Sequence, residues 1–180
     1  MRSRVAAAVL VLALGLPLTG CSSDGADPAT RGAAGAPAAG HQTAPSHLRF
    51  TAKTLDGAVF DGAALAGKPV LFWFYGAACA ECPAQAFETA ARADRYVGRV
   101  HVVAVAEPGA GNGLQGFAAP AGAGRLPHLS DVGHALRDRF HAEGINTYVL
   151  LDEDGEVLYK GAGAEGDKLD GELASVASGV

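Results

Sequence analysis

The sequence predicts an α/β fold in which helices flank a central mixed β-sheet. Two apolar runs, residues 70–75 and 100–106, have the composition of strands that are buried on both faces. A strand, a helix and a strand in this order form a right-handed crossover between two parallel strands of one sheet. The intervening helix is expected at residues 84–96, with its sheet-facing positions at Ala86, Phe87, Ala90, Ala91 and Ala93.

Two Asp-Gly pairs mark the turns of β-hairpins, which add antiparallel strands to the sheet. Asp56-Gly57 predicts an N-terminal hairpin extension, and Asp154-Gly155 predicts a second hairpin late in the chain. The elements expected outside the crossover are strands at 50–55, 58–60, 147–152 and 156–159, a helical turn near 114–117, an extended piece at 127–130, and helices at 132–140 and 168–177.

The N-terminus has the pattern of an export signal, which we assign to residues 1–20. A short basic start precedes an apolar run of about 14 residues, roughly 21 Å as a helix, whereas a bilayer core is ~30 Å thick. The Leu-Thr-Gly-Cys sequence at 18–21 resembles the lipobox of bacterial lipoproteins, whose cysteine is acylated on sulfur and becomes the new N-terminus. The resemblance implies that Cys21 carries a lipid anchor on the extracytoplasmic face of the cell membrane.

The next segment has the composition of a flexible tether. Residues 22–46 contain no Val, Ile, Leu, Met or aromatic residue and are rich in Gly, Pro, Ser and Ala. We therefore expect three parts: the signal at 1–20, the acylated cysteine and linker at 21–46, and one folded domain at 47–180. The 180-residue chain has 14 Lys and Arg against 19 Asp and Glu, so the basic surface of a nucleic-acid binder is not expected.

Two cysteines lie where the first buried strand meets the predicted helix. The Cys-x-x-Cys spacing of Cys79 and Cys82 brings their Cα atoms ~5–6 Å apart, within the range that a disulfide requires. If Cys79 is the helix N-cap, backbone amides and the helix dipole stabilise its thiolate, which makes it the nucleophile. Cys82 would then resolve the mixed disulfide, and Pro83 is tolerated in the first helical turn. This chemistry predicts a dithiol exchanger that uses no cofactor.

Two other uses of these cysteines are less favoured. A zinc site needs four ligands, and the remaining cysteine is Cys21, while the histidines lack paired ligand spacing. A purely structural disulfide between Cys79 and Cys82 would close a very small loop and stabilise little. We therefore predict no metal site.

Residues 65–75, which lead into the cysteines, and residues 152–155 resemble parts of a known family. This family is the thioredoxin-like thiol:disulfide oxidoreductases of the bacterial envelope, the TlpA, ResA and DsbE group. The resemblance covers residues 47–178 and implies a thioredoxin-like fold. It also implies that the substrates are exported proteins with thiols or disulfides, and that a membrane redox partner exchanges electrons with the protein.

The loop that would face the cysteines departs from the family pattern. The family has a cis-proline there, and this chain has Asn146 between Ile145 and Thr147, which we take as the substrate loop. Because a cis bond before a non-proline residue costs ~3–4 kcal/mol, we expect a trans or a strained cis bond before Asn146.

Other departures surround the cysteines themselves. Ala78 replaces the aromatic residue that the family has before the first cysteine, and Trp73 stands where thioredoxin has a buried acid. Glu81 lies between the cysteines, where its charge opposes ionisation of Cys79. We therefore treat Trp73, Glu81 and Pro83 as residues that modulate the cysteine pair.

The leading hypothesis is a membrane-tethered extracytoplasmic thiol:disulfide oxidoreductase, which either oxidises or reduces its protein substrates. The alternative is a copper-binding or copper-chaperone lipoprotein with weak or no redox turnover. That alternative follows from the missing proline, whose absence would leave the thiols open to soft metals.

Overall fold

The computed structural model describes residues 43–111 and 114–179. The expected signal peptide, the acylated Cys21 and most of the linker lie outside the described residues. Within the described part, none of the helices combines the length and the apolar character that crossing a bilayer requires.

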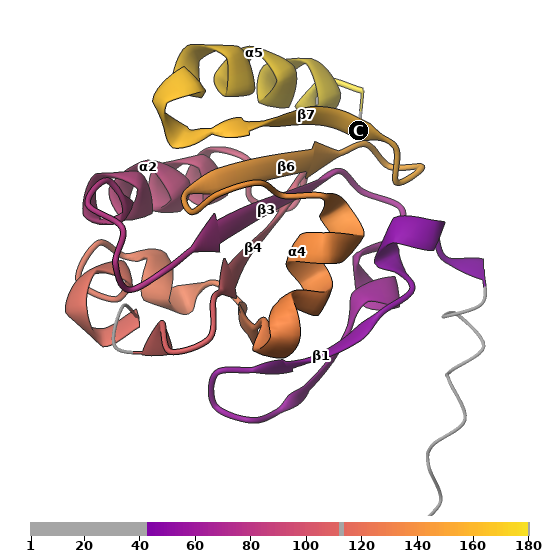
Figure 1. The fold of residues 1–180 in the computed structure, drawn as a ribbon. Helices are drawn as coiled ribbons and strands as arrows, with labels where there is room; N and C mark the ends of the chain where they lie inside the picture. Colours follow the sequence, from indigo (N-terminus) through magenta and orange to yellow (C-terminus); the bar gives the residue numbers. More distant parts are fainter. Residues whose placement is uncertain (1–42, 112–113, 180) are drawn as a thin grey trace, which may run out of the picture. The chain divides into compact units, whose positions relative to one another are not determined.

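The core of the fold is a seven-stranded mixed sheet with the strand order β2-β1-β5-β4-β3-β6-β7 (Figure 1). The β3–β4 and β4–β5 pairs are parallel, and the other pairs are antiparallel. The strands are β1 (Thr51–Thr54), β2 (Val59–Asp61), β3 (Val70–Tyr75), β4 (His101–Ala106), β5 (His128–Ser130), β6 (Thr147–Leu151) and β7 (Val157–Ala162). The predicted α/β class and mixed sheet are confirmed.

Helices cover both faces of this sheet. The α-helices are α2 (Cys82–Arg95), α4 (Ala135–Phe140) and α5 (Gly166–Ala177). Shorter 3₁₀ and π turns are η1 (Ser46–Leu48), η2 (Gly62–Leu65), η3 (Leu114–Ala118), η4 (Ala123–Arg125), η5 (Val132–His134) and η6 (Gly163–Glu165).

Two apolar cores lie on the two faces, because successive side chains of a strand point to opposite sides. Trp73 and Tyr75 of β3 belong to the core that also contains residues of α2 and α5. Phe72 and Phe74 belong to the core that contains Phe140 of α4. All six residues of β3 are buried, as expected for a central strand between two helical layers.

The sheet-facing side of α2 is narrower than expected. Ala86 and Ala90 are buried against the sheet, whereas Phe87 is 61% exposed and Ala91 is exposed. Gln85 and Thr89 are buried together with Ala86 and Ala90, so the buried face of α2 extends toward the preceding positions, and Phe87 lies a further step of about 100° outside it. The prediction that Phe87 and Ala91 face the sheet is wrong.

The helix expected at 132–140 is broken near its start. Gly133 and His134 adopt left-handed φ values of 74° and 60°, which interrupt the helical backbone. The α4 helix therefore begins at Ala135. The buried carboxylate of Asp131 accepts hydrogen bonds from the amides of Leu136 at 2.7 Å and Arg137 at 3.1 Å. These bonds satisfy amides that a helix start leaves without partners.

Candidate active site

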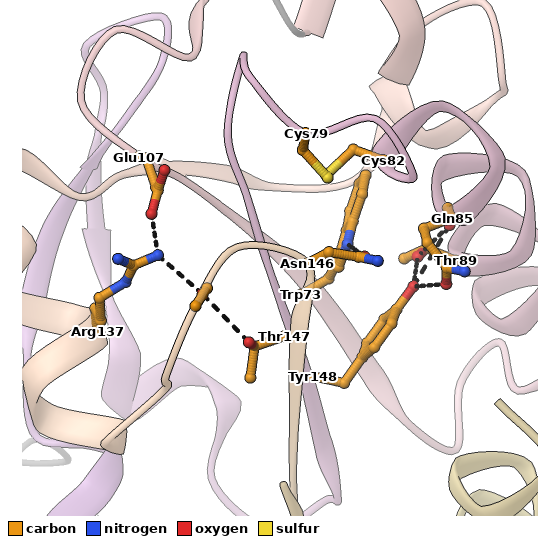
Figure 2. The surroundings of a disulfide bond; sticks show 11 residues. Trp73, Cys79, Cys82, Gln85, Thr89, Glu107, Arg137, Asn146, Thr147 and Tyr148 are labelled. Atoms are coloured by element: carbon orange, nitrogen blue, oxygen red, sulfur yellow. Dashed lines mark hydrogen bonds and ion pairs between the residues drawn. A yellow bond between two sulfur atoms is a disulfide. The ribbon is translucent and has the colours of Figure 1, made fainter. Parts of the chain in front are cut away.

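A disulfide joins Cys79 and Cys82 between the end of β3 and the start of α2 (Figure 2). The two Cα atoms are 5.3 Å apart, within the separation expected from the sequence spacing. Cys82 is fully buried, whereas Cys79 is partly exposed. The two sulfur-bearing residues therefore differ in their access to an incoming molecule.

The N-cap of α2 is Glu81. Cys79 is a candidate for that position from the sequence, but the structure does not place it there. The α2 helix begins at Cys82, and its first backbone hydrogen bond runs from the Gln85 amide to the Glu81 carbonyl, at 3.1 Å. If Cys79 were the cap, the first helical bond to its carbonyl would need an amide hydrogen on residue 83. Pro83 has none, so the helix starts where the proline falls within its first turn.

Glu81 and Pro83 are both exposed at this helix start. Glu81 occupies the N-cap position, but its side chain makes no capping hydrogen bond. The carboxylate therefore faces solvent beside the cysteines rather than bonding the helix amides.

Trp73 and Asn146 lie together beneath the disulfide (Figure 2). The indole Nε1 of the fully buried Trp73 donates a hydrogen bond to Asn146 Oδ1, at 3.2 Å. Asn146 has a left-handed φ of 61°, and its backbone carbonyl accepts a hydrogen bond from the Gly163 amide at 2.9 Å. The structure thus brings together Trp73, Asn146 and both cysteines, which the sequence placed in three separate segments.

The expected substrate loop turns through Asn146 before it enters β6. Ile145 is 38% exposed, whereas Asn146 and Thr147 are buried. Thr147 Oγ1 donates to the carbonyl oxygen of Glu143, at 2.6 Å, and lies 3.2 Å from that of Gly144. Ile145 is therefore the side chain of this loop that is open to solvent.

An ion pair between Glu107 and Arg137 contacts both the loop that carries the cysteines and the loop that precedes β6. Arg137 Nη2 also donates to the Gly144 carbonyl, at 3.0 Å. A methyl group added at Gly76, in the loop that carries the cysteines, would lie 2.5 Å from Glu107 Oε2, so the carboxylate packs directly against the Gly76 backbone. Sequence reasoning missed this pair, because its two members are 30 residues apart and carry no local motif.

A second buried polar group, formed by residues of α2 and β6, lies to the right of and below the disulfide in Figure 2. The Tyr148 hydroxyl is 2.6 Å from Thr89 Oγ1 and 3.1 Å from Gln85 Oε1. Burial raises the pKa of Tyr148 to about 12, so the phenol is neutral at physiological pH. Sequence reasoning did not identify these residues.

A buried hydrogen-bonded pair, Tyr75 and His128, lies at the end of β3. The Nε2 of buried His128 donates to the Ala123 carbonyl at 2.9 Å, so its Nδ1 accepts the hydrogen bond from the Tyr75 hydroxyl, also at 2.9 Å. Burial lowers the pKa of His128 and raises that of Tyr75, which keeps both groups neutral. This neutral pair fixes the end of the strand from which the cysteine loop departs.

The donor groups near the disulfide do not assemble into a larger metal-binding cluster. In the ranges 43–111 and 114–179, no group of three or more His, Cys, Asp or Glu side chains is placed to hold a metal ion.

A strand-to-helix junction that carries a Cys-x-x-Cys disulfide on a mixed sheet defines a thioredoxin-like protein. Residues 36–177 match the Redoxin family model, and the chain belongs to that family.

Related proteins share most of the domain. The chain is 32% identical to the soluble secreted antigen MPT53 of Mycobacterium tuberculosis over 140 residues, which cover 75% of this chain and 79% of the antigen. Among solved structures, a secreted M. tuberculosis disulfide oxidoreductase homologous to E. coli DsbE is 29% identical, with a TM-score of 0.63. The match covers 72% of this chain and 97% of that one. The dsbF protein of M. tuberculosis, solved in mixed oxidised and reduced forms, is 28% identical with a TM-score of 0.66, over 74% of this chain and 98% of that one.

Proposed function

We propose that this protein is an extracytoplasmic thiol:disulfide oxidoreductase that exchanges its Cys79–Cys82 disulfide with the thiols and disulfides of exported proteins. The observation that carries the proposal is a disulfide whose first residue is partly exposed and whose second is fully buried. The names of the secreted mycobacterial relatives support the same chemistry and the same side of the membrane.

In the oxidising direction, a substrate thiolate attacks the Cys79 sulfur and the bond to Cys82 breaks. Cys82 leaves as a thiolate, which takes up a proton. A second substrate thiolate then attacks the substrate sulfur of the mixed disulfide and releases Cys79. Two electrons and two protons pass from the substrate to the protein.

In the reducing direction, the Cys79 thiolate attacks a substrate disulfide, and Cys82 resolves the mixed disulfide that forms. Both directions use Cys79 as the attacked or attacking atom, because buried Cys82 is shielded from a protein substrate. A membrane redox partner would restore the starting state in either direction.

The loop from Ile145 to Thr147 is the surface that we propose for substrate contact. Ile145 is exposed, and its Cγ2 lies 3.4 Å from the position of a methyl group added at Gly76. Ile145 therefore packs against the start of the loop that carries Cys79. Exposed Glu81 places a negative charge next to Cys82 in the sequence and is expected to disfavour acidic substrate segments.

Membrane tethering through Cys21 is supported by the lipobox-like sequence at 18–21. Replacing Cys21 with Ser should release the protein from the membrane fraction in an expressing bacterium. Mass spectrometry of the purified protein should find acyl chains on the wild type. A wild-type protein that lacks these chains would refute the anchor and leave the redox proposal intact.

Equilibration with glutathione tests the redox function and its direction. A reduction potential of about −270 mV would assign a reductant, and one of about −120 mV would assign an oxidant. Titration of the reduced protein with Cu(I) should be run beside a model-disulfide turnover assay. Tight copper binding without turnover would replace the proposal with the copper-binding function.

A further inference from the structure

A groove lies between the β1–β2 hairpin and α4, and residues from both faces of β1 line it. Its volume is about 780 Å³, which lies within the ~300–1,000 Å³ range of ligand sites. Phe50 and Leu136 are buried apolar residues that line it, and Val59 and Val132 at its rim are 74% and 77% exposed. The groove contains none of the residues that surround the disulfide.

The backbone of β1 presents an incomplete hydrogen-bonding edge to this groove. The ladder between β1 and β5 ends at the Lys53–Ser130 pair. Continuing its antiparallel register would place Val132 opposite Thr51, but the chain turns away at Asp131 into η5. The strand edge at Thr51 therefore lines the groove without a neighbouring strand, which is an arrangement that an extended peptide can complete.

The charges around the groove are almost all positive. Arg49, Lys53 and Arg139 line it, with Lys53 on the face of β1 opposite to Phe50, in a chain whose net charge is −5. Within the described ranges, none of these three cations forms an ion pair. The acidic lining residue is Asp131, whose carboxylate already accepts two amide hydrogen bonds from α4. The groove is thus complementary to negative charge.

From the open strand edge, the apolar floor and the cationic rim, we infer that this groove binds an extended peptide segment of a partner protein, with apolar residues flanked by acidic ones. The chain's own residues 22–42 contain no Val, Ile, Leu, Met or aromatic residue that could fill the floor. The open edge at Thr51 favours a peptide over a lipid anion, because a lipid cannot continue the strand hydrogen bonds.

The test uses the full protein and two acetylated, amidated heptapeptides labelled for fluorescence anisotropy. One peptide is Glu-Val-Thr-Val-Thr-Val-Glu, and the other has Lys in place of both Glu residues. We expect the acidic peptide to bind about tenfold more tightly than the basic one, because its end charges are attracted rather than repelled. In ¹⁵N NMR spectra, the acidic peptide should shift the Thr51 amide resonance.

Charge reversals locate the site. Lys53→Glu should weaken binding of the acidic peptide about fivefold, whereas Lys160→Glu, a matched reversal of an exposed strand lysine on β7, should leave it unchanged. Lys53 is exposed and makes no side-chain hydrogen bond or ion pair among the described residues, so folding should survive its reversal. Turnover of a small disulfide should not change in either variant, which separates this site from the cysteine chemistry.

Equal binding of the two peptides, no binding of either, or equal effects of the two reversals would overturn the inference. Binding of dodecanoate without binding of the peptide would overturn it in favour of a lipid anion. A dimer in sedimentation experiments that Lys53→Glu dissociates would overturn it in favour of a second copy of this chain.

Discussion

Removing the side-chain amide of Asn146 is expected to destabilise the oxidised protein by about 2–4 kcal/mol. In Asn146→Ala, the indole N–H of fully buried Trp73 loses its acceptor at 3.2 Å, which costs about 1–3 kcal/mol. Alanine at the left-handed φ of 61° adds about 1 kcal/mol, because asparagine tolerates this region better. Asn146→Gly removes the same acceptor without that backbone penalty, so it should cost about 1 kcal/mol less than Asn146→Ala.

The assay is urea unfolding of the oxidised protein. Trp73 is the single tryptophan of the chain, so intrinsic fluorescence reports directly on this site in the Asn146 variants. A double-mutant cycle with Trp73→Phe, followed by circular dichroism, should give a coupling free energy of about 1 kcal/mol. Additive effects of the two substitutions, or an Asn146→Ala variant as stable as the wild type, would show that the bond does not hold the loop.

Further predictions concern packing and pH. Gly163→Ala should cost about 1–3 kcal/mol, because the added methyl would lie 2.6 Å from Asn146 Nδ2 and 2.7 Å from Gln85 Cδ. The matched control Gly171→Ala, in α5 with no atom within 4 Å, should gain up to about 1 kcal/mol in urea unfolding, and the opposite order would contradict the packing. Burial lowers the pKa of His128, so protonation favours the unfolded state. The free energy of unfolding should fall as the pH drops below about 6.5, by at most about 1.4 kcal/mol per unit from this group. His128→Gln should flatten this pH dependence in unfolding titrations, and an unchanged slope would exclude His128 as its source.

The strands and the cysteine pair could be predicted from the sequence because their signals are local. A continuous apolar run identifies β3, and a spacing of three residues fixes the separation of Cys79 and Cys82. The start of α2 could also have been predicted from the sequence, because Pro83 lacks the amide hydrogen that a helix capped by Cys79 would need. Cys79 as the N-cap would start the helix earlier than Pro83 allows, whereas the expected range of 84–96 starts later than α2 does.

The contacts around the disulfide could not be predicted, because they join residues that are distant in the sequence. Trp73 and Asn146 are 73 residues apart, and Tyr75 and His128 are 53 apart. The break before α4 depends on a left-handed His134, which no apolar pattern reveals. Such pairings follow from the register of the sheet, which is set by the whole fold.

Trapping of the mixed disulfide tests the proposed chemistry most directly. Reduced Cys82→Ser protein, mixed with a disulfide-bonded exported protein, should accumulate a covalent adduct through Cys79 that dithiothreitol releases and mass spectrometry identifies. Reduced Cys79→Ser protein should form little adduct under the same conditions, because Cys82 is fully buried. Equal trapping by both variants, or none by either, would contradict an exchange reaction that begins at Cys79.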